Sequence, residues 1–287
     1  MDTLQSFFTT INEQRDHTQM KFGHAMKSLA LNRANVALTR CGGDRHHPIL
    51  EDFFRRCRPM VTEHQLVRIG NANDGGYLLP DDLDGIQTCY SPGVSTMADF
   101  ELALTRRGIN CYLADYSVDS APVTDPLISF EKKFLGGTNS SKYMTLSSWI
   151  DRTSKLQDND LLLQMDIEGA EYNVLVDTST EVLQRFRILV IEFHSMEALF
   201  TPMGFRLIDA VFTKVLGQFS VVHIHPNNCM VRQRYGRFEV PPLMEFTFLR
   251  KDRITCPSPA YKFPHALDAT NVPENADFSL PPCWYAN

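Results

Sequence analysis

One stretch decides the fold: Leu161-Leu162-Leu163-Gln164-Met165-Asp166-Ile167-Glu168-Gly169-Ala170-Glu171, an apolar run that ends in three closely spaced carboxylates. Short apolar runs bounded by a polar turn are typical of buried strands of a parallel sheet, which are covered on both faces. Asp166 then follows the carboxyl end of the strand, which is the edge where open α/β sheets bind ligands. Gly169 leaves the backbone free to approach a ligand, and residues 170–176 have the apolar spacing of a helix. The stretch therefore predicts a strand, an acidic loop and a helix.

A second apolar run, 187–194, ends in Glu192-Phe193-His194. Side chains alternate along a strand, so Glu192 and His194 share a face at the end of this run. Strands that follow one another in sequence are usually neighbours in the sheet. We therefore expect Asp166 to lie beside Glu192 and His194.

The composition is that of a soluble globular protein, with 287 residues, 43% hydrophobic and 22% charged. The net charge of -6 argues against nucleic acid as a partner, because phosphates require a basic surface. No apolar run approaches the roughly 20 residues of a membrane span, and the first residues lack the pattern of a signal peptide. The seven cysteines include no C-x-x-C pair, which is typical of a reducing compartment, so we predict a cytoplasmic protein.

Three parts of the chain are predicted from composition. Residues 1–60 are expected to form a helical N-terminal extension, in which the segment 14–58 carries nine Lys and Arg against four Asp and Glu. This excess indicates a solvated helix face more readily than a surface for an anionic partner, although homo-oligomer contacts through these helices stay open. Residues 61–252 form the main domain. Residues 253–287 hold six of the sixteen prolines and are expected to be a tail packed on that domain.

The first half of the main domain has the pattern of a nucleoside-binding unit. A strand over 86–95 runs into a turn at Gly93, a helix over 97–107 opens at Ser95 or Thr96, and a strand over 110–115 closes with Asp115. In Rossmann-like folds the glycine admits the ligand to the backbone and the acid accepts the ribose hydroxyls. A full G-x-G-x-x-G is absent, so the pattern favours adenosine without a pyrophosphate.

The remaining pattern predicts how the sheet is completed. Asp74-Gly75-Gly76 is typical of a tight hairpin turn, and a third strand is expected over 129–135. After a helix over 205–216, the strands 219–225 and 245–250 follow without a helix between them. The chain is thus predicted to be an α/β protein with a mostly parallel sheet and one antiparallel edge strand.

These pieces together resemble the FkbM family of S-adenosylmethionine-dependent methyltransferases, within the class I, Rossmann-like group. The resemblance covers about 65–252 and is most specific in Asp166-Ile167-Glu168-Gly169-Ala170-Glu171 followed by a strand ending in Glu192-Phe193-His194. It also includes Asp74-Gly75-Gly76-Tyr77. The resemblance implies a seven-stranded sheet, S-adenosylmethionine as methyl donor, and an acceptor that is commonly a hydroxyl of a sugar or polyketide.

Roles are assigned on this basis. Methyl transfer to oxygen requires removal of the acceptor's proton, and His194 is the first candidate base because its ordinary pKa of about 6.5 leaves it mostly neutral. Asp166 orients it or is itself the base, and Glu192 holds the histidine or binds the acceptor. The residues assigned to the cofactor are Asp74, Gly75, Gly76, Tyr77, Gly93, Asp115, Tyr116 and Asp166, and those assigned to a small-molecule or glycan acceptor are Glu168, His225 and Asn228.

Alternatives remain open at this stage. A divalent metal held by Asp166, Glu168 and His194 is possible chemistry but is not favoured, because such ligands suit many ions. Glu171 is read as a favourable charge at the helix N-terminus, and Asn227 as a turn residue. A binding protein without catalysis on the same fold is one alternative function. A nicotinamide-dependent oxidoreductase is another, which the missing dinucleotide motif disfavours.

Overall fold

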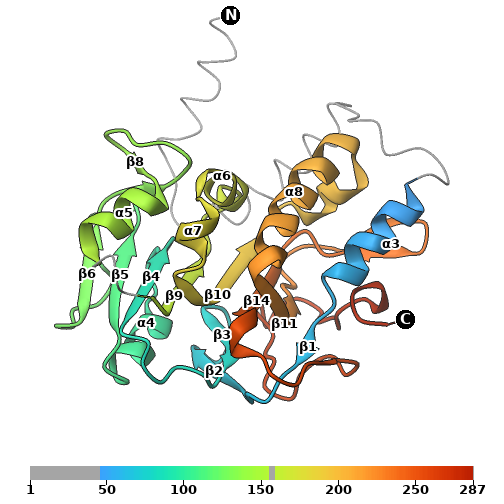
Figure 1. Ribbon diagram of the computed structural model, residues 1–287, viewed down its shortest axis with the longest axis horizontal. Coiled ribbons are helices and arrows are strands. Elements are labelled where there is room, and N and C mark those ends of the chain that lie inside the picture. The colour runs from blue at the N-terminus through green and yellow to red at the C-terminus, as the bar shows by residue number, and fades with distance from the viewer. Residues whose placement is uncertain (1–45, 155–158, 287) are drawn as a thin grey trace, which may run out of the picture. The chain divides into compact units, whose positions relative to one another are not determined.

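The computed structural model in Figure 1 describes residues 46–154 and 159–286. The helices predicted before residue 46, and with them the proposed oligomer contacts, lie outside the described residues. The main structure is a seven-stranded sheet with the spatial order β11-β14-β10-β9-β4-β5-β6. Its strands are β4 Thr88–Pro92, β5 Asn110–Ala114, β6 Ile128–Glu131, β9 Leu161–Met165, β10 Phe186–Phe193, β11 Phe219–Pro226 and β14 Met244–Arg250.

All neighbouring pairs from β10 to β6 are parallel, whereas β14 runs antiparallel to both β10 and β11. The prediction of a Rossmann-like, mostly parallel sheet is confirmed. The antiparallel strand β14 is the last of these seven strands in sequence, and it lies one place in from the edge strand β11. The predicted third strand is divided into β6 and the separate strand β7 Phe134–Leu135, because the chain turns between them where the N–H of Lys133 bonds the carbonyl of Glu131.

Six helices connect or cover the strands in the described part of the chain, together with three short 3₁₀ helices. The α-helices are α3 His47–Arg56, α4 Asp99–Thr105, α5 Leu146–Thr153, α6 Glu171–Asp177, α7 Thr180–Leu183 and α8 Pro202–Gln218, and the 3₁₀ helices are η1 Met196–Phe200, η2 Lys251–Arg253 and η3 Pro282–Trp284. The hydroxyl of Thr145 accepts the N–H of Ser148 and caps α5, as its sequence predicts. The predicted cap of α4 is wrong: Ala98 occupies that position without a side-chain bond.

Two apolar cores form on opposite faces of the sheet, and the alternation along β9 shows why. Leu161, Leu163 and Met165 pack with residues of α3, α5, α6 and α8, which lie together above the sheet in Figure 1. Leu162 points to the other face, where α4 and the hairpin of β2 Leu66–Gly70 and β3 Gly76–Pro80 pack. Because both faces of β9 are covered, all five of its residues are buried, as a continuous apolar run requires.

The predicted hairpin at Asp74-Gly75-Gly76 is present, with Gly70 opposite Gly76. A Cβ atom on Gly76 would lie 1.9 Å from the carbonyl oxygen of Asn71, so only glycine permits this close turn. The remaining strands form small two-stranded sheets outside the main one: β1 Met60–Val61 with β15 Ser258–Pro259, β7 with β8 Tyr143–Met144, and β12 Gln233–Tyr235 with β13 Phe238–Val240.

The C-terminal segment 253–286 is anchored to the domain. The side chains of Leu280 and Trp284 are buried, and the Trp284 ring packs edge-on against Phe54 of α3 at 4.6 Å between centroids. Asn271 is buried on the hairpin face of the sheet. The described helices include none that is long and apolar enough to cross a membrane.

Candidate functional site

The carboxyl ends of β9 and β10 bring an imidazole and several carboxylates together. The two strands pair in parallel with Met165 opposite Ile191, so the residues that follow them meet at one edge. Nε2 of His194 lies 3.8 Å from Oδ1 of Asp166, 3.8 Å from Oε1 of Glu192 and 3.5 Å from Oε2 of Glu168. These separations exceed a hydrogen bond, so a hydroxyl oxygen or a water can bridge the groups. The expected juxtaposition of Asp166 with Glu192 and His194 is present.

Glu171 has a role that the sequence analysis did not assign. Its carboxylate is fully buried, accepts the backbone N–H groups of Ile167 and Gly169 at 3.1 Å, and contacts Nδ1 of His194 at 3.1 Å. One side chain therefore fixes both the turn after β9 and the imidazole. The turn requires this support because Glu168 has a left-handed backbone, with φ of 60°. We call His194 with Asp166, Glu168, Glu171 and Glu192 the acidic cluster.

The electrostatics of the acidic cluster change the expected proton positions. Burial opposes a charge on His194, but the carboxylates of Glu171, Asp166 and Glu192 outweigh it and raise the pKa of the imidazole to about 10. Burial, together with neighbouring acids, raises the pKa of Asp166 to about 7, and it raises the pKa of Glu192 as well. The expectation of a neutral His194 is therefore wrong, because the neighbouring carboxylates raise its pKa well above the ordinary value. Asp166 is the group that titrates near neutral pH.

Gly93 follows β4, where the strand order reverses between β4 and β9, and Asp115 follows the neighbouring strand β5. In such sheets this crevice is the ligand position. A Cβ atom on Gly93, which has φ of 91°, would lie 1.6 Å from the backbone oxygen of Asp166. Gly93 therefore lets the two loops meet and so places Asp166. The carboxylate of Asp115 accepts the N–H of Ser95 at 2.9 Å and that of Ser117 at 2.7 Å, which fixes the loop after β4.

A chain of buried polar side chains runs beneath this crevice. The hydroxyl of Ser91 donates to Oε1 of Gln164 at 2.7 Å and contacts the carboxyl group of Glu101, and Nε2 of Gln164 donates to the hydroxyl of Tyr77 at 3.2 Å. Ser91 has a single hydroxyl proton, and the amide oxygen of Gln164 cannot donate one. Burial raises the pKa of Glu101 to about 7, so near neutral pH its protonated form is able to donate to Ser91, which frees the Ser91 proton for Gln164.

The remaining predicted cofactor residues lie on two sides of the crevice. Gly75 has φ of 77° in the hairpin turn, and Oδ1 of the preceding Asp74 lies 3.4 Å from Nδ2 of Asn271. Tyr116 follows Asp115, and its ring packs against Phe134 at 5.4 Å between centroids. The structure thus places Gly93, Asp115 and Tyr116 together and the hairpin residues nearer the C-terminal segment.

The predicted acceptor residues have different surroundings. The side chain of Glu168 is 60% exposed at the mouth of the acidic cluster. His225 is buried and contacts Asn271, through its Nε2, at 3.0 Å. The amide group of Asn228 donates to the carbonyl of Val272 at 2.9 Å and accepts its N–H at 2.8 Å, so Asn228 anchors the C-terminal segment. Asn227 is more than a turn residue, because its amide donates to Glu192 at 3.2 Å.

The family assignment rests on one match. Residues 95–217 match the family model described as the methyltransferase FkbM domain. Over this range the chain is similar to the FkbM methyltransferases. The range includes Asp115, Asp166 and the pair Glu192 and His194, so the predicted resemblance is confirmed where it is most specific.

Comparison with solved structures gives distant likenesses only, and no curated protein matches the chain. A protein from Streptococcus thermophilus assigned as a hemolysin is 12% identical with a TM-score of 0.34, and the match covers 63% of each chain. A protein from Listeria monocytogenes assigned as an S-adenosylmethionine-dependent methyltransferase is 9% identical with a TM-score of 0.35, covering 71% of this chain and 99% of that one. The match to the fibrillarin/Nop5p complex has 12% identity and a TM-score of 0.36, and it covers 67% of this chain and 98% of that one. Scores this low carry no argument about function.

The methyltransferase family implies S-adenosylmethionine as cofactor, and the residues present fit it. A carboxylate offers about four acceptor positions, and Asp115 uses two of them for backbone N–H groups, so others remain for ribose hydroxyls. The acidic cluster holds four carboxyl groups and one imidazolium, a charge balance that suits a cationic sulfonium. Both features lie at the switch point where the fold predicts the ligand.

Several polar residues of the candidate site were not found by sequence reasoning. The sequence predicts only a helix-end role for Glu171 and no role for Glu101. Asp268 and Asn271 belong to the proline-rich C-terminal segment, yet both contact side chains of β11. Glu171 follows an apolar run and Glu101 lies within α4, so each carries a weak local signal. The contacts of Asp268 and Asn271 span about 45 residues and leave no local pattern.

Proposed function

We propose that the chain is an S-adenosylmethionine-dependent O-methyltransferase that acts on a hydroxyl of a sugar or another small hydroxylated metabolite in the cytoplasm. The observation that carries the proposal is the position of Asp166, which follows β9 at the switch point and lies 3.8 Å from Nε2 of His194. Burial raises the pKa of Asp166 to about 7. A general base is most effective when its pKa is close to the working pH. The net charge of -6 supports a small acceptor over nucleic acid.

The proposed roles follow from the positions of the protons. Ionised Asp166 accepts the proton of the acceptor hydroxyl as the new oxygen–carbon bond forms. His194 remains protonated, is held at Nδ1 by Glu171, and directs its Nε2 proton toward the same space, where it orients the acceptor oxygen. Glu192, whose pKa is raised, can donate a hydrogen bond to a second hydroxyl. When bound, S-adenosylmethionine supplies an electrophilic methyl group attached to a sulfonium, and loss of this methyl group leaves S-adenosylhomocysteine with an uncharged sulfur.

Cofactor binding is the first test. Isothermal titration calorimetry with S-adenosylhomocysteine is expected to show binding, and titration with NADH none. Asp115→Ala is expected to weaken the affinity because it removes the ribose acceptor and loosens the loop held by Ser95 and Ser117. Asp119→Asn is the matched control, because this acid is exposed and pairs with Lys132. Equal affinity in the wild type and Asp115→Ala would remove the assigned role, and no nucleoside binding at all would favour a protein without this activity.

Methyl transfer is the second test. Radiolabel from the methyl group of S-adenosylmethionine should appear in one or more members of a panel of sugars and small alcohols, and mass spectrometry should locate it on oxygen. Label found only on nitrogen or carbon acceptors would contradict the proposed acceptor class.

Metal-assisted deprotonation is a second candidate mechanism with an observation in its favour. Ligand atoms of Asp166, Glu192 and His194 lie within 4.8 Å of one another, a set in which Glu192 replaces the predicted Glu168. A metal would lower the pKa of a bound hydroxyl and displace the proton from His194. Activity that survives EDTA supports the Asp166 mechanism. Activity lost in EDTA and restored by Mg²⁺ or Mn²⁺ supports the metal.

A further inference from the structure

A second cluster of ionisable groups lies on β11, under the C-terminal segment and two strands from β10. His223 and His225 share one face of β11, and both face Asp268. Nε2 of His223 lies 2.8 Å, and Nδ1 of His225 3.5 Å, from the same oxygen, Oδ1 of Asp268. We call these three residues the tail cluster. All three candidate ligand atoms lie within 4.8 Å of one another.

The tautomer of His225 is set by its other neighbour. Nδ2 of Asn271 donates to Glu245 at 2.7 Å, so the amide oxygen of Asn271 is oriented toward Nε2 of His225 at 3.0 Å and accepts its proton. Nδ1 of a neutral His225 is then an acceptor. It is buried and makes no hydrogen bond to any residue in the described part of the chain. Nδ1 and the carboxylate oxygen of Asp268 are two acceptors that face each other, an arrangement that requires a cation between them, either a proton or a metal ion.

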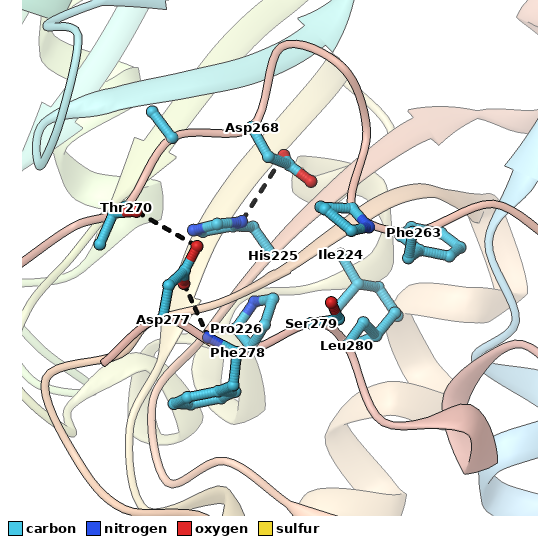
Figure 2. A pocket seen from close by; sticks show the side chains of 12 residues that line it. Ile224, His225, Pro226, Phe263, Asp268, Thr270, Asp277, Phe278, Ser279 and Leu280 are labelled. Atoms are coloured by element: carbon cyan, nitrogen blue, oxygen red, sulfur yellow. Dashed lines mark hydrogen bonds and ion pairs between the residues drawn. The ribbon is translucent and has the colours of Figure 1, made fainter. Parts of the chain in front are cut away.

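The surroundings match those of protein metal sites. Histidines that bind metals usually donate their second ring N–H to an oxygen acceptor, which is the role of Asn271 here. The cluster also has an open side, because His225 and Asp268 line a pocket of about 200 Å³ whose other wall is made by the C-terminal segment. Figure 2 shows the two side chains pointing toward each other at the edge of this pocket. A metal ion there would complete its coordination with water or a small oxygen ligand from the pocket.

We propose that His223, His225 and Asp268 form a binding site for a divalent transition metal of the Zn²⁺ type. Two imidazole nitrogens and one carboxylate oxygen form a ligand set that such ions accept, with bonds of about 2.0–2.2 Å. Mg²⁺ and Ca²⁺ prefer sites made of oxygen ligands. The ion ties the C-terminal segment to β11, since Asp268 comes from that segment and both histidines from the strand. The proposal does not depend on methyl transfer.

The test uses the full chain, free of any histidine tag and dialysed against a chelator, in calorimetric titration with ZnCl₂. The expected result is one tight site that Mg²⁺ does not occupy, with a higher melting temperature when Zn²⁺ is present. Asp268→Asn and His225→Gln should each weaken this binding by at least about 100-fold, because loss of even an outer partner of a ligand costs about 10- to 100-fold. His64→Asn is the control, because His64 lies apart from the cluster beside Asp82.

Asp166→Asn separates this site from the acidic cluster, which also contains possible ligands. The tail-cluster proposal requires that Asp166→Asn keep the tight Zn²⁺ site. Loss of Zn²⁺ binding only in Asp166→Asn would overturn it, as would a wild type that binds no Zn²⁺ or binds Mg²⁺ equally well. Melting curves without metal show whether each variant folds. If Asp268→Asn does not fold, His225→Gln decides the outcome, because it keeps Asp268 for the contact with His223.

Discussion

The acidic cluster and the tail cluster use the same groups in opposite proportions. One imidazole, His194, lies among four carboxyl groups, whereas in the tail cluster two imidazoles share the single carboxylate of Asp268. The first arrangement fixes a proton on the histidine and leaves Asp166 to titrate near neutral pH. The second places a nitrogen atom of each of two imidazoles beside the same carboxylate oxygen. The ratio of carboxylates to imidazoles thus separates a site suited to moving protons from one suited to holding a metal ion.

The largest expected effect tests the acidic half of this comparison. Asp166→Asn keeps the size of the side chain but cannot accept the acceptor's proton, so kcat should fall by about 10² to 10⁴, the usual contribution of a general base. In the wild type, kcat/KM should rise with pH through about 7 as Asp166 ionises, and this rise should vanish in the variant. Initial rates across pH 5 to 9 measure both.

Glu168→Gln is the matched control for Asp166→Asn, because Glu168 also faces Nε2 of His194 but is 60% exposed. Its effect should be below about tenfold, with the pH dependence kept. If Glu168→Gln reduced turnover more than Asp166→Asn, the base would be misassigned.

The second prediction concerns a substitution that displaces the backbone at Asp166 and changes no side chain of the acidic cluster. Gly93→Ala places a Cβ atom against the backbone oxygen of Asp166 in a left-handed conformation, so the domain should lose about 2 to 4 kcal/mol of stability and most of its affinity for S-adenosylhomocysteine. Gly108→Ala separates the two causes, since Gly108 also has a positive φ but no atom within 4 Å of the new Cβ. Similar denaturant midpoints for the two variants would contradict the proposed contact.

Contacts between residues that lie close together along the chain could be predicted from the sequence, whereas contacts between distant residues could not. The positions of β9 and β10 and the meeting of Asp166 with His194 follow from two apolar runs that are adjacent in sequence and pair in parallel. The proton on His194 could not be predicted, because it depends on how four carboxyl groups are oriented and buried. The tail cluster could not be predicted from the sequence for another reason. Alternation along a strand places His223 and His225 on one face, but their partner Asp268 lies about 45 residues later, between β15 and η3.

The third effect sharpens the role of Glu171. Glu171→Gln keeps the oxygen that accepts the N–H groups of Ile167 and Gly169 but removes the charge that holds His194 protonated. The pKa of His194 should fall from about 10 toward its ordinary range, which an NMR titration of the histidine resonances measures, and kcat should fall about tenfold. Glu181→Gln on α7 is the control, since this glutamate is exposed. An unchanged histidine titration in Glu171→Gln would show that other carboxylates hold the proton.

The smallest effect concerns Glu101, which lies under the acidic cluster and is predicted to be a proton donor. Its pKa in the folded protein is raised from 4.5 to about 7, so the stability that the neutral form contributes is complete below about pH 4.5 and is lost as pH rises through about 7. Glu101→Gln supplies a permanent donor to Ser91 and does not titrate. Relative to the wild type, the variant should change stability by less than about 1 kcal/mol at pH 5 and become the more stable form at pH 8, with one pKa unit corresponding to about 1.4 kcal/mol. Urea unfolding at the two pH values measures this difference, and Asp151→Asn at an exposed position of α5 should show no such change. If Glu101→Gln were instead destabilised equally at both pH values, Glu101 would be ionised in the folded protein, and the direction of the chain from Glu101 through Ser91 to Gln164 would have to be reversed.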